Sequence, residues 1–252
     1  ELPRPPFDFE GAWFQVGDAA RLQLHHTPWW RHLYRDFRRY RATGESVGRA
    51  LQCLERFGQR LRDMKAERVR VVGTNTLRKA KRKGAFLDRA REALGHPIEI
   101  ISGVEEARLI YLGVAHTTPS EGGHRLVMDV GGGSTELIIG EGFATRRLES
   151  LYMGCVSMAT AHFADGEITE KRFKRARTAA ELELEPVTAR FRRSEWDAAF
   201  GASGTMRSVS EVLLARGAPN GDITREGVQW LVEECLRAAD IWMAIVIGHV
   251  LR

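Results

Sequence analysis

Residues 126–140 read LVMDVGGGSTELIIG and place three consecutive glycines between two apolar runs. Glycine loses more conformational freedom on folding than any other residue, so three together beside a strand are costly. Each apolar run has the length of one strand, and the pair predicts a tight hairpin with the glycines at its turn. The sequence therefore predicts a sheet that ends in an exposed stretch of bare backbone.

Such a turn offers successive backbone N–H groups with no Cβ atom in the way, an arrangement that binds anions and phosphate above all. Ser134 and Thr135 add hydroxyl donors, and Asp129 and Glu136 flank the turn. Two carboxylates would repel a phosphate unless a hard cation such as Mg²⁺ lies between them. The alternative is an ordinary glycine hairpin with two surface acids. The pattern is neither a Walker A loop nor a GxGxxG motif that opens a helix.

The composition is that of a water-soluble globular protein, with 43% hydrophobic and 28% charged residues among 252. This length suits one large domain or two small ones. No apolar run reaches the roughly 20 residues of a membrane helix, and no leader-like segment opens the sequence, so we expect no membrane partner. The three cysteines are widely spaced and odd in number, which favours a reducing cytoplasm.

The net charge of +5 is concentrated in residues 31–41 and 77–91. Basic surfaces attract polyanions of any kind, including nucleic acid, polyphosphate and phosphorylated nucleotides. Charge alone does not choose among these ligands. A solvated basic face without a ligand is the alternative.

The first half of the chain alternates helical and strand patterns, which predicts an α/β layer. Apolar residues recur at three- and four-residue steps from Ser46, and a second helix is expected to end at Gly95. Strands are expected at 68–76 and 97–102, and a helix at 103–115. Residues 1–40 have no regular pattern.

The polar segment 116–124 is expected to mark a boundary between an N-terminal α/β domain, residues 1–121, and a second α/β domain, residues 122–252. Strands are expected at 125–130, 135–140 and 143–153 and at the start of 196–205. Helices are expected at 168–191, 205–217 and 224–240, with Thr169 as an N-cap.

Three further places could carry chemistry. Glu105 and Glu106 open the helix at 103–115, where acids are also favourable without any function. Arg78 follows a buried strand and could bind phosphate, or it could be an exposed helix-start residue. Gly204 and Thr205 lie between a strand and a helix, where backbone amides hold phosphate, although a plain turn is equally compatible.

Five segments carry a resemblance to a known family: GTNTLR, IEIISGVEEARLIYLGV, VMDVGGGSTELIIG, YMGCVSMA and GASGT, in that order. Together they resemble the exopolyphosphatase/guanosine pentaphosphate phosphatase family over roughly residues 45–240. The resemblance implies the actin-like ATPase superfold, which is ribonuclease H-like and has two α/β domains flanking a cleft. It also implies a homodimer.

The resemblance implies a role for each matching residue. Glu106, in the first domain, corresponds to the general base, and Asp129 and Glu136 in the second domain correspond to acids that hold Mg²⁺ or another divalent cation. The implied phosphate-binding residues are Arg78, Gly131, Gly132, Gly133, Ser134, Thr135, Gly204 and Thr205. Phosphoryl transfer needs these parts: a positioned water, a charge-neutralising metal and donors to the phosphate oxygens.

The implied activity is that of a hydrolase that removes the terminal phosphate from inorganic polyphosphate. Guanosine pentaphosphate, a nucleotide of the stringent response, is the other implied substrate, and no nucleic acid is expected as a partner. The family carries a first phosphate loop, Asp-Leu/Ile-Gly-Ser/Thr-Asn-Ser, which is not found in residues 1–45; the nearest strand–turn–strand text, FQVGDAARLQL at residues 14–24, lacks the pattern. This motivates an alternative, a non-catalytic sensor of polyphosphate or (p)ppGpp; an ATP phosphotransferase is a weaker third. The family's second domain continues further, so we expect residues 122–252 to hold it in incomplete form.

Overall fold

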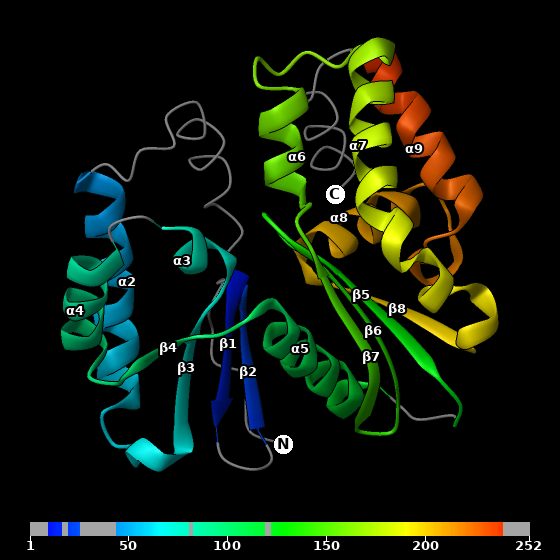
Figure 1. Ribbon diagram of the computed structural model, residues 1–252. Helices are drawn as coiled ribbons and strands as arrows, with labels where there is room; N and C mark the ends of the chain where they lie inside the picture. The colour runs from blue at the N-terminus through cyan, green and yellow to red at the C-terminus, as the bar shows by residue number, and fades with distance from the viewer. Residues whose placement is uncertain (1–9, 17–19, 26–43, 81–82, 119–121, 239–252) are drawn as a thin grey trace. The chain divides into compact units, whose positions relative to one another are not determined.

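A computed structural model describes residues 10–16, 20–25, 44–80, 83–118 and 122–238. The basic segment 31–41 lies outside the described residues. The chain forms two compact units, residues 1–102 and residues 103–252 (Figure 1).

Unit 1 contains a four-stranded sheet in the order β2-β1-β3-β4. Its strands are β1 (Glu10–Val16), β2 (Ala20–His25), β3 (Val69–Gly73) and β4 (Ile98–Ile100). β1 pairs antiparallel with β2 and with β3, whereas β3 and β4 run parallel. The hairpin of β1 and β2 falls on the strand–turn–strand text of residues 14–24, and its turn, 17–19, lies outside the described residues.

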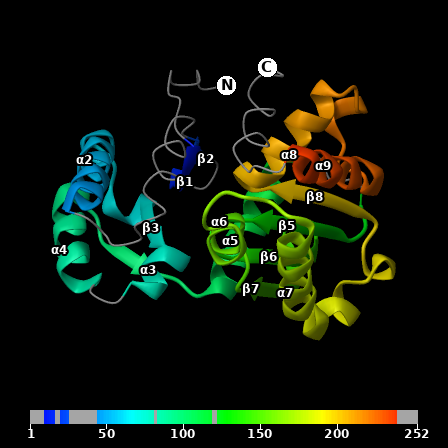
Figure 2. The same cartoon turned by 90° about the horizontal axis from the view of Figure 1, so that it is seen from above.

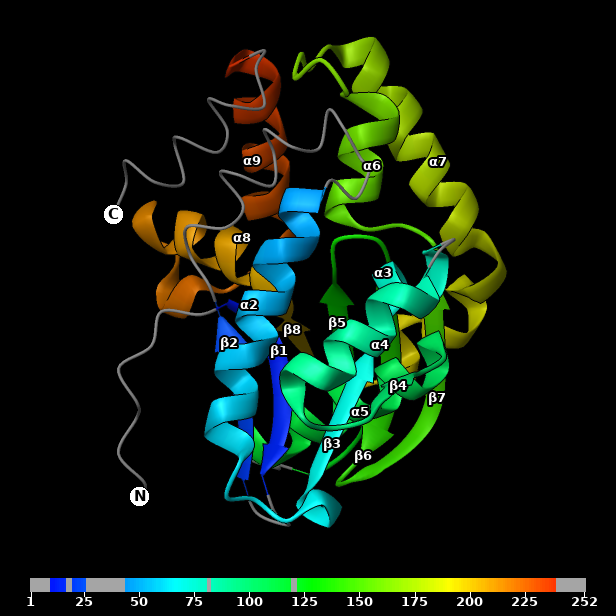
Figure 3. The ribbon, with the colours of Figure 1, turned by 90° about the vertical axis from the view of Figure 1, so that its left-hand side faces the viewer.

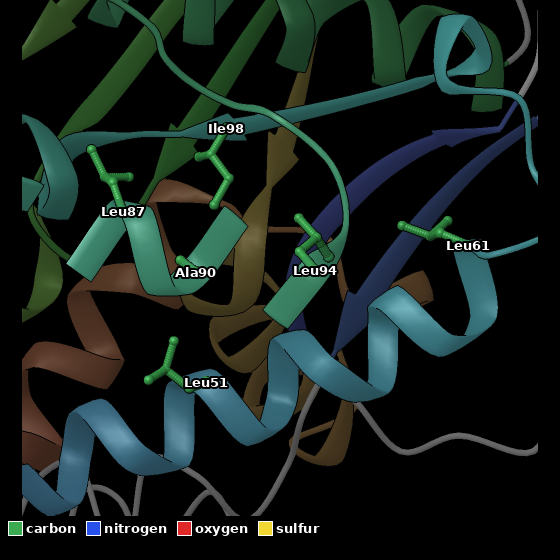
Figure 4. Close-up of a cluster of buried hydrophobic side chains, with 6 residues drawn as sticks. All are labelled: Leu51, Leu61, Leu87, Ala90, Leu94 and Ile98. Atoms are coloured by element: carbon green, nitrogen blue, oxygen red, sulfur yellow. The ribbon is translucent and has the colours of Figure 1, made fainter. Parts of the chain in front are cut away.

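The core of unit 1 is formed by the two long helices and the sheet. Its helices are α2 (Gly44–Leu61), α3 (Asn75–Lys79) and α4 (Lys83–Leu94). The helices α2 and α4 lie side by side (Figure 3). A Cβ at Gly58 would lie 2.6 Å from the Leu94 carbonyl oxygen, so glycine is needed where the helices meet. Figure 4 shows the buried side chains of this core, Leu51, Leu61, Leu87, Ala90, Leu94 and Ile98.

Unit 2 contains the sheet that carries the glycine-rich turn, in the order β7-β6-β5-β8 (Figure 2). Its strands are β5 (Arg125–Val130), β6 (Thr135–Glu141), β7 (Ala144–Leu151) and β8 (Ala198–Ala202). β5, β6 and β7 form an antiparallel meander, as predicted, whereas β8 adds parallel to β5.

The helices of unit 2 cover both faces of this sheet. They are α5 (Gly103–Thr117), α6 (Cys155–His162), α7 (Glu170–Thr188), α8 (Ser203–Ala215) and α9 (Arg225–Ala238). One apolar cluster joins α5 to Val127 and Ile138, and another joins Val187 of α7 to Leu137 and Leu151. Because neighbouring residues of a strand face opposite sides, these clusters lie on opposite faces.

Helix α5 belongs to unit 2, whereas the boundary expected at 121/122 puts it with the first domain. The reason is packing: Ala107, Tyr111 and Ala115 recur every four residues and are buried against β5 and β6. Figure 1 shows α5 lying along these strands. The chain passes from unit 1 to unit 2 at Ser102 and Gly103, before the helix and not after it.

Two predicted helix ends are confirmed. The Thr169 hydroxyl accepts a hydrogen bond from the Arg172 amide at the start of α7, as an N-cap does. Gly95 follows α4 with φ +75° and donates to the Arg91 carbonyl. Within the described residues, no helix combines the length and the apolar character needed to cross a bilayer.

Candidate active site

Two acidic side chains lie directly opposite each other at the end of the β5–β6 hairpin. The register pairs Val130 with Thr135 and Asp129 with Glu136. Residues opposite each other in an antiparallel pair project from the same face, with Cβ atoms about 5 Å apart. Asp129 and Glu136, seven positions apart in the sequence, are therefore neighbours in space. Two neighbouring carboxylates destabilise the hairpin unless a proton or a cation offsets their charge.

Both carboxyl groups are buried, and burial raises both pKa values. Asp129 is 7% exposed and its pKa rises to about 6; Glu136 is 1% exposed and its pKa rises to about 7. Burial is the largest cause, and the nearby charge of Glu106 adds to it in both cases. The Ser150 hydroxyl, opposite Glu136 on β7, donates to Glu136 Oε1 at 2.8 Å and partly offsets the shift.

Glu106 joins this pair because of its place on α5. It precedes Ala107, which is fully buried against the sheet, and Ile110, one turn after Glu106, packs against the same core. Val127 and Ile138 of that core lie two residues from Asp129 and Glu136 on the same face of each strand. The stripe of α5 that docks on the sheet thus carries Glu106 toward the two acids.

The neighbouring acid, Glu105, has a different environment. Its carboxylate accepts two hydrogen bonds from the Arg108 guanidinium, at 2.7 and 2.8 Å, one turn along the same helix. This ion pair neutralises Glu105, whereas Glu106 adds negative charge to the buried pair. The two adjacent glutamates therefore differ in electrostatic environment, a difference that the sequence alone does not show.

The glycine turn, residues 131–134, is closed by the Gly131 amide, which donates to the Ser134 carbonyl at 3.0 Å. The carbonyls of Gly131 and Gly132 accept from the first amides of α6, at Cys155, Val156 and Ser157. In the described part of the chain, no hydrogen bond uses the amides of Gly132 or Gly133. These two N–H groups are the donors that the turn can offer to an anion.

The turn does not need glycine for a left-handed backbone, because φ is not positive at residues 131–133. Instead, the turn is pressed against Gly154, where a Cβ would lie 2.6 Å from backbone atoms of all three glycines. A Cβ at Gly132 would make only ordinary contact, 3.5 Å from Val156. Internal packing therefore does not require glycine at 132.

One of the two hydroxyls predicted to contact phosphate is hydrogen-bonded within the fold. The Thr135 hydroxyl donates to the Met153 carbonyl at 2.7 Å, and Ser134 is one of the neighbours that lower the pKa of Glu136 against the effect of burial. Both residues are buried. A hydroxyl has one hydrogen to donate, so Thr135 differs from the expectation: its donor stabilises the turn.

The GASGT segment ends β8 and opens α8. A Cβ at Gly201 would lie 2.7 Å from Cε and 3.0 Å from Cβ of Met206, so the Met206 side chain would have to shift, whereas a Cβ at Gly204 would meet open space. Parallel pairing ends at Asp129 and Ala202, so the turns that follow β5 and β8 leave the sheet side by side. The structure therefore places Gly204 and Thr205 beside the glycine turn of the same unit.

Arg78 belongs to unit 1. Its guanidinium donates to the Ile101 carbonyl at 2.9 Å, and the Ile101 amide donates to the Gly73 carbonyl. Arg78 thus holds the end of the β4 segment in addition to any contact with a ligand.

Sequence reasoning missed Gly154 and Ser150. A signal for Ser150 was available, because it falls opposite Glu136 once the meander is registered. Gly154 had no local signal, since its need arises from a turn twenty residues away along the chain.

The fold and these acids define a class: the protein has the actin-like ATPase fold of its structural neighbours. The solved structure of the Aquifex aeolicus PPX-GPPA enzyme matches with a TM-score of 0.61 and 28% identity, over 83% of this chain and 75% of that one. The family model of the Ppx/GppA phosphatase family matches residues 39–241. The chain belongs to the Ppx/GppA phosphatase family.

Two curated relatives are similar in sequence. A Haemophilus influenzae protein whose assigned name is exopolyphosphatase is 45% identical over 194 residues, which cover 77% of this chain and 60% of that protein. The Vibrio cholerae guanosine-5'-triphosphate,3'-diphosphate pyrophosphatase is 47% identical over 173 residues, 69% of this chain and 35% of that protein. The chain therefore matches only part of the length of these relatives.

Proposed function

We propose that this protein is a divalent-metal-dependent hydrolase that removes the terminal phosphate from inorganic polyphosphate. One observation carries the proposal: Asp129 and Glu136 form a buried pair of acids, with Glu106 beside them, next to a glycine turn that presents open amides. Family membership and the relative named as an exopolyphosphatase support it.

The acid pair fits a divalent cation on physical grounds. Two buried carboxylates in register, with a third acid nearby, form an excess of negative charge that a cation relieves. Mg²⁺ is bound through one or two carboxylates together with water and phosphate oxygens, so Asp129 and Glu136 suffice. Among the described residues, no group of three or more ligating side chains is placed to hold a metal ion, so the proposal depends on the pair Asp129 and Glu136. When bound, the cation supplies neutralisation of the phosphate oxygens.

The side chains divide the chemical work. Glu106 accepts a proton from a water molecule as the water oxygen attacks the terminal phosphorus. The bond from that phosphorus to the bridging oxygen breaks, its electron pair stays on the shortened chain, and phosphate is released. The amides of Gly132 and Gly133 donate to the phosphate oxygens, where charge gathers in the transition state.

Polyphosphate is favoured as the substrate because of the basic surface of unit 1. Lys79, Arg89 and Arg91 are exposed on α3 and α4. A long polyanion gains from each such contact, and its binding weakens steeply with salt. Guanosine pentaphosphate is a second candidate, supported by the Vibrio cholerae relative. Cytoplasmic location and a homodimer belong to the proposal through the cysteine pattern and the family resemblance.

The test is phosphate release from polyphosphate and from guanosine pentaphosphate by the full-length protein, with Mg²⁺ present, at increasing salt. We expect release from polyphosphate with a KM that rises steeply with salt. A preference for the nucleotide with weak salt dependence would contradict the choice of polyphosphate. Binding of either ligand without phosphate release would instead favour a non-catalytic sensor, which the unmatched phosphate-loop motif in residues 1–45 motivates.

A further inference from the structure

Three side chains form a row across the sheet of unit 2, at the end that carries the glycine turn. Asp129 of β5 lies opposite Glu136 of β6, and Glu136 lies opposite Ser150 of β7. Residues directly opposite each other in antiparallel strands project from the same face, with Cβ atoms about 5 Å apart. Glu136 is therefore the middle member of the row, with an acid on one side and a hydroxyl on the other.

The Ser150 hydroxyl is hydrogen-bonded to this middle member. It donates to Glu136 Oε1 at 2.8 Å, the usual length of an O–H···O hydrogen bond. A serine hydroxyl has one hydrogen, and this bond uses it. Ser150 is half-buried and is the next-to-last residue of β7, so the pairing of β7 with β6 fixes its backbone beside the acid.

The environment of Glu136 explains why one hydrogen bond matters. Its side chain has three rotatable torsions and is 1% exposed, so bulk water does not replace a lost partner. Asp129, on the side of β5, repels the ionised carboxylate, whereas Ser150, on the side of β7, attracts it. The bond therefore holds Oε1 toward β7 and away from Asp129.

The chemical nature of the donor matters as well. Glu105 of α5 is held by the Arg108 guanidinium, which neutralises its charge. Ser150 holds Glu136 with a neutral group and leaves the negative charge of the ionised carboxylate available to a cation. We propose that Ser150 is a positioning residue, whose hydroxyl orients the Glu136 carboxylate for cation binding. This inference rests on the proposed function of Glu136 as a metal-holding acid.

The test uses three variants of the full-length protein. Ser150→Ala removes the hydroxyl, whereas Ser150→Thr keeps it on a side chain that is favourable in a strand. Thr145→Ala is the matched control, because it removes a hydroxyl from the same strand at its other end, opposite Gly140. Mn²⁺ affinity is measured by calorimetry, thermal stability without metal by melting, and kcat and KM by phosphate release.

We expect Ser150→Ala to lose about 10- to 100-fold in Mn²⁺ affinity, the usual effect of removing a partner that orients a metal ligand. Ser150→Thr should recover most of this affinity, and Thr145→Ala should bind Mn²⁺ like the wild type. At limiting Mn²⁺, the fall in kcat of Ser150→Ala should be larger than its change in KM. A purely structural role would lower the melting temperature and leave the Mn²⁺ affinity of the folded protein unchanged. Wild-type affinity in Ser150→Ala, or an equal loss in either of the other two variants, would overturn the proposal.

Crystal structures separate failure of this proposal from failure of the proposed function. Without metal, Ser150→Ala should show the Glu136 carboxylate turned away from its position in the wild type. If the wild-type protein neither binds Mn²⁺ nor releases phosphate, the proposed function fails, and this comparison alone decides whether Ser150 orients Glu136. An unchanged Glu136 side chain would overturn that role.

Discussion

At the scale of single residues, the surroundings of a side chain determine its properties more than its type does. Glu105 and Glu106 are adjacent and identical in type, yet Arg108 neutralises one while the other faces two buried acids. Likewise, Gly132 and Gly154 are both glycines at the same turn, but only Gly154 is fixed by the packing of the protein itself. In each pair the two residues share a type and differ in what surrounds them.

The two glycines give a residue-scale prediction. Gly132→Ala should leave the free energy of unfolding nearly unchanged and weaken phosphate binding, because its Cβ meets only Val156 at ordinary distance. Gly154→Ala should lower the free energy of unfolding by about 1–3 kcal/mol and lose activity as well, since its Cβ would overlap backbone atoms. Urea unfolding and phosphate-release kinetics measure the two effects. An equally stable, inactive Gly154→Ala variant would contradict this division.

At the scale of elements, α5 is the part that builds the site. Its buried stripe docks on β5 and β6, and the same docking brings Glu106 to the acid pair. The Tyr111 ring is fully buried, and its hydroxyl donates to the Gly142 carbonyl at 3.2 Å. The position of the proposed base therefore depends on apolar packing. A change that disturbs this packing should lower both the stability of the fold and the activity.

This dependence predicts the effect of Gly140→Ala. The new Cβ would lie 2.3 Å from the Tyr111 ring and 2.5 Å from the Ala144 carbonyl, so α5 must shift away from β6. We expect a loss of about 1–3 kcal/mol in the free energy of unfolding, as for other overpacked cores, with a fall in kcat. Gly142→Ala is the control for the same hairpin: its φ of +55° makes it strained, but its Cβ meets open space. A fall in kcat in the control as large as in Gly140→Ala would contradict the account.

Many of the helices, strands and turns were predictable from the sequence. The meander, the Thr169 cap and the opposition of Asp129 to Glu136 follow from local periodicity and a short turn, which act within a few residues. Two features could not be predicted from the sequence: the unit to which α5 belongs, and the positive φ of Ser203 (+78°) at the start of α8. They depend on which sheet buries Tyr111 and on the parallel pairing of β8 with β5, contacts between segments far apart in the chain. The β1–β2 hairpin had a strand–turn–strand signal at residues 14–24, but the pairing of β1 with β3 depends on segments far apart in the chain.

At the scale of the whole molecule, the buried acids link stability to pH. The pKa values of Asp129 and Glu136 rise from 3.8 to about 6 and from 4.5 to about 7. A carboxyl whose pKa is higher in the folded state favours folding while protonated, so these groups stabilise the metal-free protein below about pH 4 and lose that contribution as the pH rises to 7. Each pKa unit corresponds to about 1.4 kcal/mol.

We therefore expect the metal-free wild type to lose more unfolding free energy between pH 4.5 and pH 7.5 than the variant Asp129→Asn/Glu136→Gln. Mg²⁺ should reverse the trend, because protons compete with the cation for the same carboxylates, and its stabilising effect should be larger at pH 7.5 than at pH 5. Urea unfolding at both pH values, with and without Mg²⁺, measures this. Equal pH dependence in wild type and variant would exclude the buried pair as its source.

Proton transfer by Glu106, the proposed base, and not by its neighbour Glu105 has a direct kinetic test. The measurement is phosphate release from polyphosphate by wild type, Glu106→Gln and Glu105→Gln at saturating Mg²⁺, with Mg²⁺ and polyphosphate affinity measured in parallel. We predict that Glu106→Gln loses about 10²- to 10⁴-fold in kcat and still binds both ligands, whereas Glu105→Gln retains most of its turnover. Near-normal kcat in Glu106→Gln, with both ligands bound, would contradict it.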